Sequence, residues 1–550
     1  MWFRNVYLKT LRDYRIAIIG WGVGMGFTIV SPMASVATLI STPAQREALA
    51  GIAAQFAWNA SAVAVTTIGG YATFKIGIFV FMACIWPLLA ASRMLRGEEE
   101  RGSLDVLLSA PRSRVSIAVQ KVAAMWTALL LIGLISGVIA YLGGIAFKAD
   151  FSPAGGLLWG LDLALICMVF GGLALLISQF THERGPAAGA TGALLVVFIV
   201  VDMVHRIYPD AEWFSRLSPI YYYNLSKPII PSYGTSVGGM LALLAISLVL
   251  TAAAIWLFAR RDVKDVVALP WAARLTRPSM ASKALPVGDW SLGSVYARSL
   301  GQIAAATFWW TLGFAAFTVW MLVAVNQLSK QLTTLLEAGP SSIAVRILQN
   351  IGGGTTLNEL LLGAMFELMP VLLMAFAVTQ VNRWTNDADE GRLDMVLATP
   401  NPRANVLLGR FAALATATVV VGVVTLLAGA ATAKASGVSL DMGYFAEAAL
   451  GMIPLGLLIA AIGYLAAGWL RTAADTGLIS FLLAAWFLIS FVGPDLKWPD
   501  ATLRLSPFYY YGTPLLHGLQ FGNLAVIVVA GVIALALAVY RFGRKDILPG

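Results

Sequence analysis

Apolar residues gather along the chain in stretches of about 20, which short polar segments separate. A helix of that length crosses the hydrocarbon core of a bilayer, because each residue adds about 1.5 Å. The stretches predict twelve transmembrane helices, near residues 16–38, 76–93, 122–147, 157–180, 187–207, 237–259, 300–326, 359–381, 411–434, 446–470, 473–493 and 522–541. The expected fold class is therefore an all-α polytopic membrane protein.

The two halves of the chain repeat each other. Val6-Tyr7 recurs as Val295-Tyr296 and Trp21 as Trp310, both 289 positions later. Three longer segments recur in the same order: 102–114 as 391–403 at 289 positions, 216–223 as 504–511 at 288, and 260–263 as 544–547 at 284. Matched landmarks at a nearly constant spacing predict two fused copies of a six-helix unit. Copies with an even number of helices are parallel repeats, related by an axis along the membrane normal.

These repeats predict four parts of the chain. Residues 1–15 form an interfacial amphipathic helix, with apolar side chains on one face and basic ones on the other. The first six-helix repeat covers 16–259 and the second covers 299–550. A basic linker with three prolines, 260–298, joins them and is not expected to be a single helix.

Composition supports a membrane protein and gives no metal site. Apolar residues make up 59% of the 550 residues and charged residues 12%, whereas a soluble domain is about one quarter charged. The cysteines, Cys84 and Cys167, lie inside apolar stretches, and the three histidines are scattered. No metal-ligand spacing results.

The position of the basic residues predicts the orientation. Of 37 Lys and Arg residues, 26 lie at the termini or in loops after even-numbered helices, and 11 lie in loops after odd-numbered ones. By the positive-inside rule both termini are cytoplasmic. The net charge of +9 thus orients the chain in the membrane, and no nucleic-acid partner is expected.

The loop after the second helix of each repeat has the pattern of a docking element. In the first copy Leu104, Leu107 and Leu108 share one face of a short helix, which Gly102 precedes and Pro111 ends. Acidic residues flank the leucines, and anionic lipid repels them, so docking into another protein is favoured over lying on the lipid surface. The residues assigned to this coupling site are Glu98, Glu99, Glu100, Gly102, Leu104, Asp105, Leu107, Leu108 and Arg114, and, in the second copy, Asp387, Asp389, Glu390, Gly391, Leu393, Asp394, Val396, Leu397 and Arg403.

A Leu-Ser-Pro-aromatic segment follows the fifth helix of each repeat, on the predicted outer side. It carries Pro219, Tyr221, Tyr222 and Tyr223 in the first copy and Pro507, Tyr509, Tyr510 and Tyr511 in the second. Tyrosines at a membrane interface typically anchor short helices among the lipid headgroups. A gate that closes the exit is the alternative.

Glu367 is the acidic residue placed nearest the middle of a predicted helix, about 12 Å inward from Glu359. A carboxyl group at that depth faces a partner, a cavity or a transport pathway. Glu367, Phe366, Met369 and Phe79 are therefore assigned to a substrate pathway. The alternatives are a protonated Glu367 that bonds a neighbouring helix, and a helix that begins elsewhere.

The chain has no ATPase motif. A phosphate-binding P-loop needs Gly-Lys-Ser/Thr after a glycine-rich turn. Only Lys9 precedes a Ser or Thr, and Leu8 stands before it. Energy must therefore come from a partner or from an ion gradient.

These motifs resemble the ABC-2 type permeases, which are membrane subunits of ATP-binding-cassette exporters. The resemblance rests on E-x-x-G-x-L-x-x-L-L-x-x-P-x-x-R from Glu99 to Arg114, on its looser copy ending at Arg403, and on the Leu-Ser-Pro-aromatic segments. The length and the fused form resemble actinobacterial permeases for polyketide or tetronasin-type antibiotics. The second copy departs from the pattern at Arg392 and Pro402, so its docking site is expected to differ from the first.

The resemblance implies two copies of a separate ABC ATPase subunit, which hold the ATP and Mg, bound at the two coupling loops. It also implies export of hydrophobic or amphipathic small molecules across a bacterial inner membrane. An ion-coupled secondary transporter is the alternative, although the loop expected of the major facilitator plan is absent. A lipid-modifying membrane enzyme is disfavoured because the charges are isolated, and a lipid or glycan cargo stays open.

Overall fold

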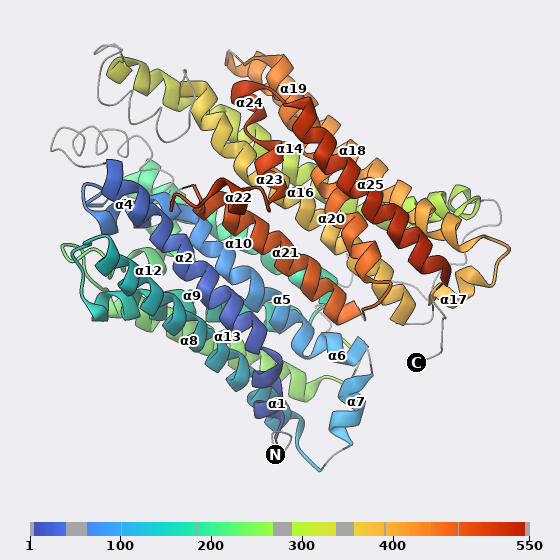
Figure 1. The fold of residues 1–550 in the computed structure, drawn as a ribbon. Coiled ribbons are helices and arrows are strands. Elements are labelled where there is room, and N and C mark those ends of the chain that lie inside the picture. Colours follow the sequence, from blue (N-terminus) through green and yellow to red (C-terminus); the bar gives the residue numbers. More distant parts are fainter. Residues whose placement is uncertain are drawn as a thin grey trace. The chain divides into compact units, whose positions relative to one another are not determined.

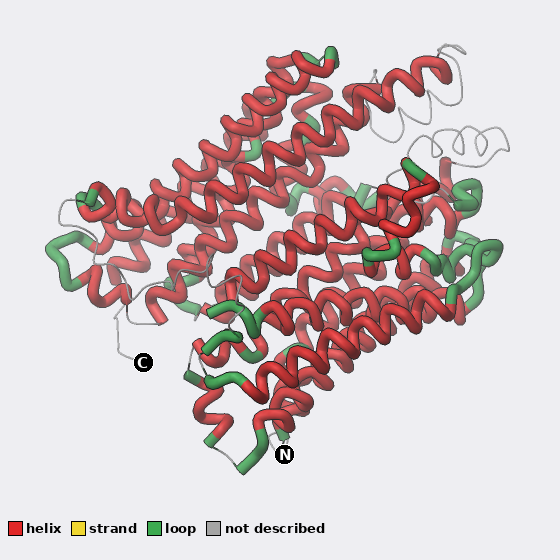
Figure 2. The backbone as a smooth tube through the Cα atoms, turned by 180° about the vertical axis from the view of Figure 1, so that it is seen from behind, coloured by secondary structure: helices red, strands yellow, loops and turns green. Residues whose placement is uncertain are grey.

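The computed structural model describes most of the chain as helix (Figure 2). The described residues are 5–39, 63–100, 102–109, 111–182, 184–263, 265–267, 289–336, 357–389, 392–438, 440–470, 472–494 and 496–544. Among them no strand occurs, which confirms the all-α fold class.

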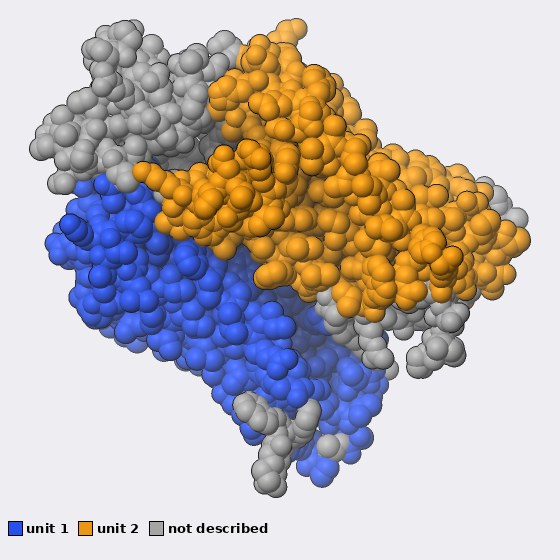
Figure 3. Space-filling model, viewed as in Figure 1, with its two compact units in different colours: residues 1–281 blue, residues 282–550 orange. Residues whose placement is uncertain are grey.

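The chain divides into two compact units, residues 1–281 and 282–550 (Figure 3). Each unit contains one of the two sequence repeats. The middle of the predicted linker, 268–288, lies outside the described residues, so the domain boundaries remain predictions.

Unit 1 is a bundle of long helices (Figure 1). Its membrane-length helices are α2 (Arg15–Leu39), α8 (Arg114–Ala146), α9 (Pro153–Ile177), α10 (Arg184–Ile207) and α13 (Val237–Arg260). The N-terminal helix α1 (Val6–Asp13) packs against α8, where Tyr7 and Thr127 share a hydrogen bond of 3.0 Å between their oxygens. The core lies along α9, whose buried side chains include Phe170 and Leu175.

The second predicted helix, 76–93, corresponds to a 3-10 segment η1 (Gly77–Cys84) followed by α5 (Ile85–Met94). A further helix, α4 (Ile68–Ile76), precedes it, and the chain bends by 59° between α4 and the segment Val80–Met94. Gly77 at the break has φ +43°, a conformation that residues with a Cβ rarely adopt. Hydropathy alone cannot show such a break, because the residues on both sides of Gly77 are apolar.

Unit 2 repeats the arrangement with α14 (Val295–Leu336), α16 (Leu357–Asp389), α18 (Arg403–Ser436), α21 (Thr472–Val492) and α25 (Phe521–Arg544). The counterpart of α9 consists of α19 (Met442–Gly451) and α20 (Ile453–Ala466), which are interrupted only at Met452, shortly before Pro454, and together form one membrane-length segment. Tyr296 and Thr416 share a 3.0 Å hydrogen bond at positions 289 beyond those of Tyr7 and Thr127. The same contact thus recurs at the offset that the sequence repeat predicts.

Ten described helices are long and apolar enough to span a membrane, and the bent pair that contains α5 would make eleven. The predicted count of twelve is therefore not confirmed. The remaining predicted helix corresponds to α16, which has 33 residues and contains Pro370.

Candidate functional site

The candidate coupling loop of unit 1 is built from two short helices. These are α6 (Arg96–Glu100), which continues from α5, and α7 (Ser103–Leu108). Gly102 stands before α7 with φ +69°, so the chain can reverse there without a Cβ clash. α8 then begins at Arg114, and its N-cap is Ser113, whose side chain accepts a hydrogen bond from the N–H of Ser116. We call the end of each unit that carries this loop the docking end.

The apolar face of α7 points into its own unit. Leu104 is fully buried in the core of unit 1, and Leu107 and Leu108 are partly buried against the same core. Asp105 and Val106 face outward, and Val106 is 73% exposed. The leucines therefore attach α7 to the permease, and the surface that remains for a partner is the opposite face, around Val106.

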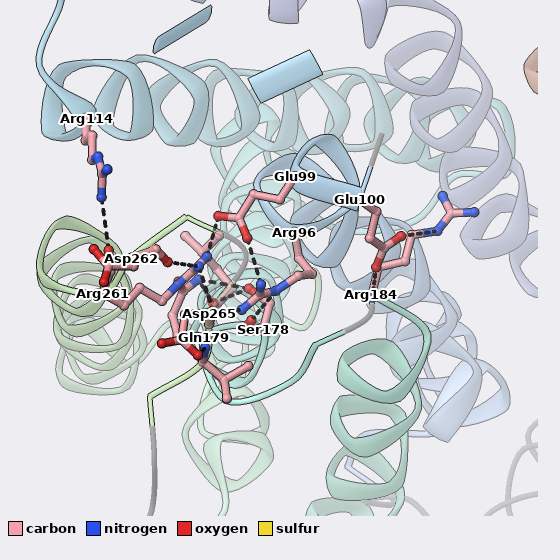
Figure 4. Close-up of polar contacts among 12 residues, drawn as sticks. Arg96, Glu99, Glu100, Arg114, Ser178, Gln179, Arg184, Arg261, Asp262 and Asp265 are labelled. Atoms are coloured by element: carbon pink, nitrogen blue, oxygen red, sulfur yellow. Dashed lines mark hydrogen bonds and ion pairs between the residues drawn. The ribbon is translucent and has the colours of Figure 1, made fainter. Parts of the chain in front are cut away.

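The three glutamates that precede α7 are bound to three different helices. Glu98 accepts a hydrogen bond from Lys121 of α8. Glu100 accepts one from the backbone N–H of Arg184, where α10 begins. Glu99, 1% exposed, lies 2.7 Å from an Arg96 nitrogen and 2.5 Å from an Arg261 nitrogen (Figure 4). The three carboxylates that were expected to form an acidic surface beside α7 are therefore largely paired with residues of unit 1 itself.

We call Arg96, Glu99 and Arg261 the charge clamp. Its two guanidinium groups bind the ends of further segments: Arg96 Nε donates to the Ser178 carbonyl at 3.2 Å, and Arg261 Nε donates to Gln179 Oε1 at 2.9 Å (Figure 4). Burial lowers the pKa of Arg96, and Arg261 lowers it further, while Glu99 opposes both. Because Arg96 and Arg261 share the one carboxylate of Glu99, the stability of the clamp depends on Glu99.

The backbone around the clamp joins the docking loop to the end of α13. Asp265 accepts hydrogen bonds at its carbonyl from Arg96 and from Arg261, each at 2.9 Å. Arg114, the first residue of α8, donates to the Arg261 carbonyl at 3.0 Å. The clamp therefore joins α6, the α9 end and α13, while Arg114 adds α8.

The short helix of the second copy also points its apolar face into its own unit. In α17 (Arg392–Leu397) Leu393 is buried, and Val396 and Leu397 pack against a small cluster beside it. Met395, at the position 289 beyond Val106, is 74% exposed. An outward apolar residue is thus present at the same place in both copies.

One ion pair of the loop is repeated as well. Asp387 lies 2.7 Å from Arg410 of α18, and these positions correspond to Glu98 and Lys121. Asp387 also lies 3.0 Å from the exposed Arg392. Glu390 and Gly391, and the side chains of Asp389 and Asp394, lie outside the described residues, and Arg403 begins α18.

The charge clamp is not repeated. Thr385 and Ala388 stand at the positions that correspond to Arg96 and Glu99. Aromatic rings fill this part of unit 2: Trp384 packs edge-on against Tyr464 with centroids 5.6 Å apart, and Arg410 lies 4.5 Å above the Trp384 ring. The prediction of unequal docking loops rested on Arg392 and Pro402, whereas the main structural difference lies in what holds each loop.

The aromatic segments lie at the opposite end of each unit. Ser218 caps α12 (Pro219–Asn224) and donates to the Phe198 carbonyl at 2.8 Å, and Ser506 caps α23 (Pro507–Tyr511) and donates to the Trp486 carbonyl at 3.0 Å. The last tyrosine of each triplet, Tyr223 or Tyr511, is buried. Pro219 and Pro507 are also buried, whereas Tyr222 and Tyr510 are half-buried and Tyr509 is exposed. These contacts fasten short helices to the bundle, and the choice between anchor and gate remains a prediction.

A buried polar cluster near α12 is absent from the predicted sites. Asp202 pairs with Arg206 on α10 and accepts a 2.9 Å hydrogen bond from Asn224. Lys227, 5% exposed in the turn after α12, donates to Asn224 Oδ1 at 3.2 Å, and burial lowers the pKa of Lys227 to about 8. A cavity of about 30 Å³ beside them has room for one or two water molecules. The sequence held a signal, since Asp202 stands inside a predicted helix.

The predicted substrate-pathway residues lie in the cores of their units where their side chains are described. Phe366 is buried against Phe445, with ring centroids 5.5 Å apart, and Met369 is fully buried. The side chains of Glu367 and Phe79 lie outside the described residues, so their role stays a prediction. Among the described residues no group of three or more His, Cys, Asp or Glu side chains could hold a metal.

Membrane-length helices in two repeat-related units, with a loop of paired charges at one end of each, define a multi-pass membrane protein. Residues 4–263 match the family model described as ABC-2 family transporter protein. Residues 292–543 match the one described as Multidrug efflux system permease Rv1217c, C-terminal domain. Among curated proteins none matches the chain. Together the two matches cover most of the chain and support an ABC-2 type permease, a membrane subunit of an ATP-binding-cassette transporter.

Proposed function

We propose that this permease exports hydrophobic or amphipathic small molecules, and that two copies of a separately encoded ABC ATPase drive it. The observation that carries the proposal is the pair of short helices α7 and α17. Each has its apolar face buried in its own unit and an exposed apolar residue, Val106 or Met395, facing away. Because the same outward apolar side chain is present on a firmly attached helix in both units, each unit can bind one copy of the same partner.

The charge clamp would carry force from the ATPase into the permease. A load on α7 passes through Gly102 to α6, and from α6 through Glu99 to the ends of α9 and α13. Arg114 adds a direct contact between the start of α8 and the end of α13. Short, charge-assisted contacts of this kind hold their geometry better than leucine packing alone.

The orientation follows from the basic residues. The docking end would face the cytoplasm, where ATP is available, and both termini would lie on that side. ATP and Mg would bind in the ATPase subunits, and this chain would have no catalytic centre. Export in a bacterial inner membrane then directs cargo towards α12 and α23.

The cargo class is supported by the match of the second half to a multidrug efflux permease domain. Lipid or glycan export on the same architecture is the alternative. An ion-coupled transporter is the other alternative, and the buried Asp202–Arg206 pair within α10 is the feature that would favour it.

Transport assays on reconstituted vesicles separate these proposals. Inside-out vesicles would contain the permease with the ATPase encoded beside it, and uptake of an apolar fluorescent dye would be followed. We expect uptake that requires ATP, is lost when the ATPase is omitted, and persists when the proton gradient is collapsed. Uptake driven by a proton gradient without ATPase would overturn the proposal, and ATP-driven movement of labelled lipid but no dye would support the lipid alternative.

A further inference from the structure

Unit 2 has a large cavity at the end opposite α17. The residues around it follow α22 (Asp500–Leu503) and belong to α23, α24 (Pro514–His517) and the start of α25. Its volume is about 490 Å³, within the range of small-molecule sites. The polar lining includes Arg504, Tyr509, Tyr510, His517, Gln520 and Asn523. No acidic side chain is among the described residues that line it.

The arginine of this cavity differs from its counterpart in unit 1. Arg216 lies 3.1 Å from Glu212, which also accepts a hydrogen bond from Tyr221. In unit 2 the corresponding acid is Asp500, which is one methylene shorter than Glu212. Among the described ion pairs none joins Asp500 to Arg504. The guanidinium of Arg504 lies 5.9 Å from the centre of the Tyr509 ring. The Tyr509 side chain raises the pKa of Arg504, and the charge of Asp500 adds to this rise without forming an ion pair.

Other hydrogen-bond donors line the same cavity as Arg504. Asn523 donates one amide hydrogen to Gln520 Oε1 at 2.9 Å and has a second one, and His517 Nδ1 lies 3.1 Å from Thr513 Oγ1. Tyr509 and Tyr510 also line the cavity, whereas the hydroxyl of Tyr511 donates to the Ala448 carbonyl at 2.9 Å. A guanidinium with amide and hydroxyl donors, and no carboxylate in the lining, favours a phosphate or carboxylate anion.

The neighbouring face of α25 indicates what carries the anion. Phe521 is 76% exposed at its start, and Val528, Val529 and Val532 are exposed further along. In a membrane protein such a face is covered by acyl chains. A ligand with its anionic group beside Arg504 could extend its apolar chains along this face.

We propose that this cavity, the Arg504 site, binds the phosphate of an anionic phospholipid from the membrane leaflet at this end. Arg504 contacts the phosphate oxygens, and the tyrosines enclose the rest of the headgroup. The corresponding position in unit 1 does not offer an equivalent site, because Glu212 pairs with the guanidinium of Arg216. The proposal does not depend on the ATPase partner or on the exported cargo.

Native mass spectrometry of the purified chain in a neutral detergent tests the proposal. Short-chain phosphatidylglycerol would be titrated against phosphatidylcholine and against inorganic phosphate. We expect phosphatidylglycerol to bind the wild type most tightly, and Arg504→Gln to weaken that binding about tenfold, as loss of a charge-assisted contact would. Asp500→Glu should weaken it too, because the longer acid builds the pair that Glu212 makes.

Arg216→Gln is the matched control, and it should leave binding unchanged. Equal binding by the wild type and Arg504→Gln would overturn the proposal, as would an equal loss in Arg216→Gln. Equal affinity for phosphatidylcholine would contradict recognition of the anion. Equal affinity for inorganic phosphate would contradict a lipid ligand.

Discussion

Glu99 neutralises two buried arginines with one carboxylate. Its change to Gln keeps the size of the side chain but removes the carboxylate that pairs directly with Arg96 and Arg261. Loss of one partner from a buried ion pair typically costs about 3–5 kcal/mol. We expect Glu99→Gln to lower the unfolding temperature of the detergent-solubilised protein and the yield of folded permease.

Glu100→Gln is the matched control, because Glu100 is 30% exposed and its second oxygen lies 3.9 Å from Arg184. Exposed pairs contribute about 0–1 kcal/mol, so this change should have a small effect. Similar losses in both variants would contradict a special role for Glu99.

Lys227 gives a prediction about pH. Burial lowers the pKa of Lys227 from an ordinary 10.5 to about 8, so between pH 8 and 10.5 the unfolded chain holds a proton that the folded chain has released. Stability rises with pH wherever the unfolded state binds more protons. The unfolding temperature of the wild type, measured relative to Lys227→Met at each pH, should therefore rise between pH 8 and 10.5 and stay level below pH 8. A flat difference across that window would contradict the low pKa.

At the scale of elements, α8 and α9 pack closely against each other where Gly133 of α8 faces Gly160 of α9. A Cβ added at Gly133 would lie 2.2 Å from the Gly160 carbonyl oxygen, closer than any side chain tolerates. Gly133→Ala should therefore push the two helices apart and cost about 1–3 kcal/mol or more, as overpacking does. Thermal unfolding followed by tryptophan fluorescence would measure the loss.

The repeat supplies the control for this prediction. Gly422 occupies the position 289 beyond Gly133. A Cβ there would lie 3.0 Å from the tip of the Ile453 side chain, which can move, and 3.2 Å from the Ala449 carbonyl oxygen, about 1 Å farther than the backbone oxygen that a Cβ at Gly133 would meet. Gly422→Ala should be tolerated better. If both changes destabilised the protein equally, the close crossing in unit 1 would not be what limits substitution.

Local pattern predicted these elements well, and contacts distant in sequence were not predicted. Apolar runs of about 20 residues placed helices such as α2, α10 and α13 within a few residues of their observed ends. The pairing of Glu99 with Arg261 could not be predicted in the same way, because Arg261 is 162 positions away and only the packed bundle brings the two together. The acidic residues before α7 looked available to a partner for this reason.

The face of α7 shows a second limit of local pattern. The spacing of Leu104, Leu107 and Leu108 correctly predicts a helix with one apolar side. It does not show what packs against that side, and in the structure the core of unit 1 itself packs there. Leu104→Asp should accordingly reduce the yield of folded protein, a defect of folding rather than of docking.

At the scale of the whole molecule, the two repeats share one plan but hold their docking loops differently. Unit 1 uses the charge clamp, and unit 2 uses the aromatic cluster around Trp384. Raised salt screens exposed ion pairs far more than buried ones, so it should disturb neither loop strongly. The outward residues Val106 and Met395 are the feature that both docking ends have in common.

Co-purification of the tagged permease with the ATPase encoded beside it tests the central claim most directly. We expect Val106→Asp with Met395→Asp to fold and insert normally but to lose the ATPase by about tenfold or more, since each change puts a charge into an apolar interface. Val106→Leu with Met395→Leu keeps the knobs apolar and should retain the ATPase. Full retention of the ATPase by the double aspartate variant would contradict the account.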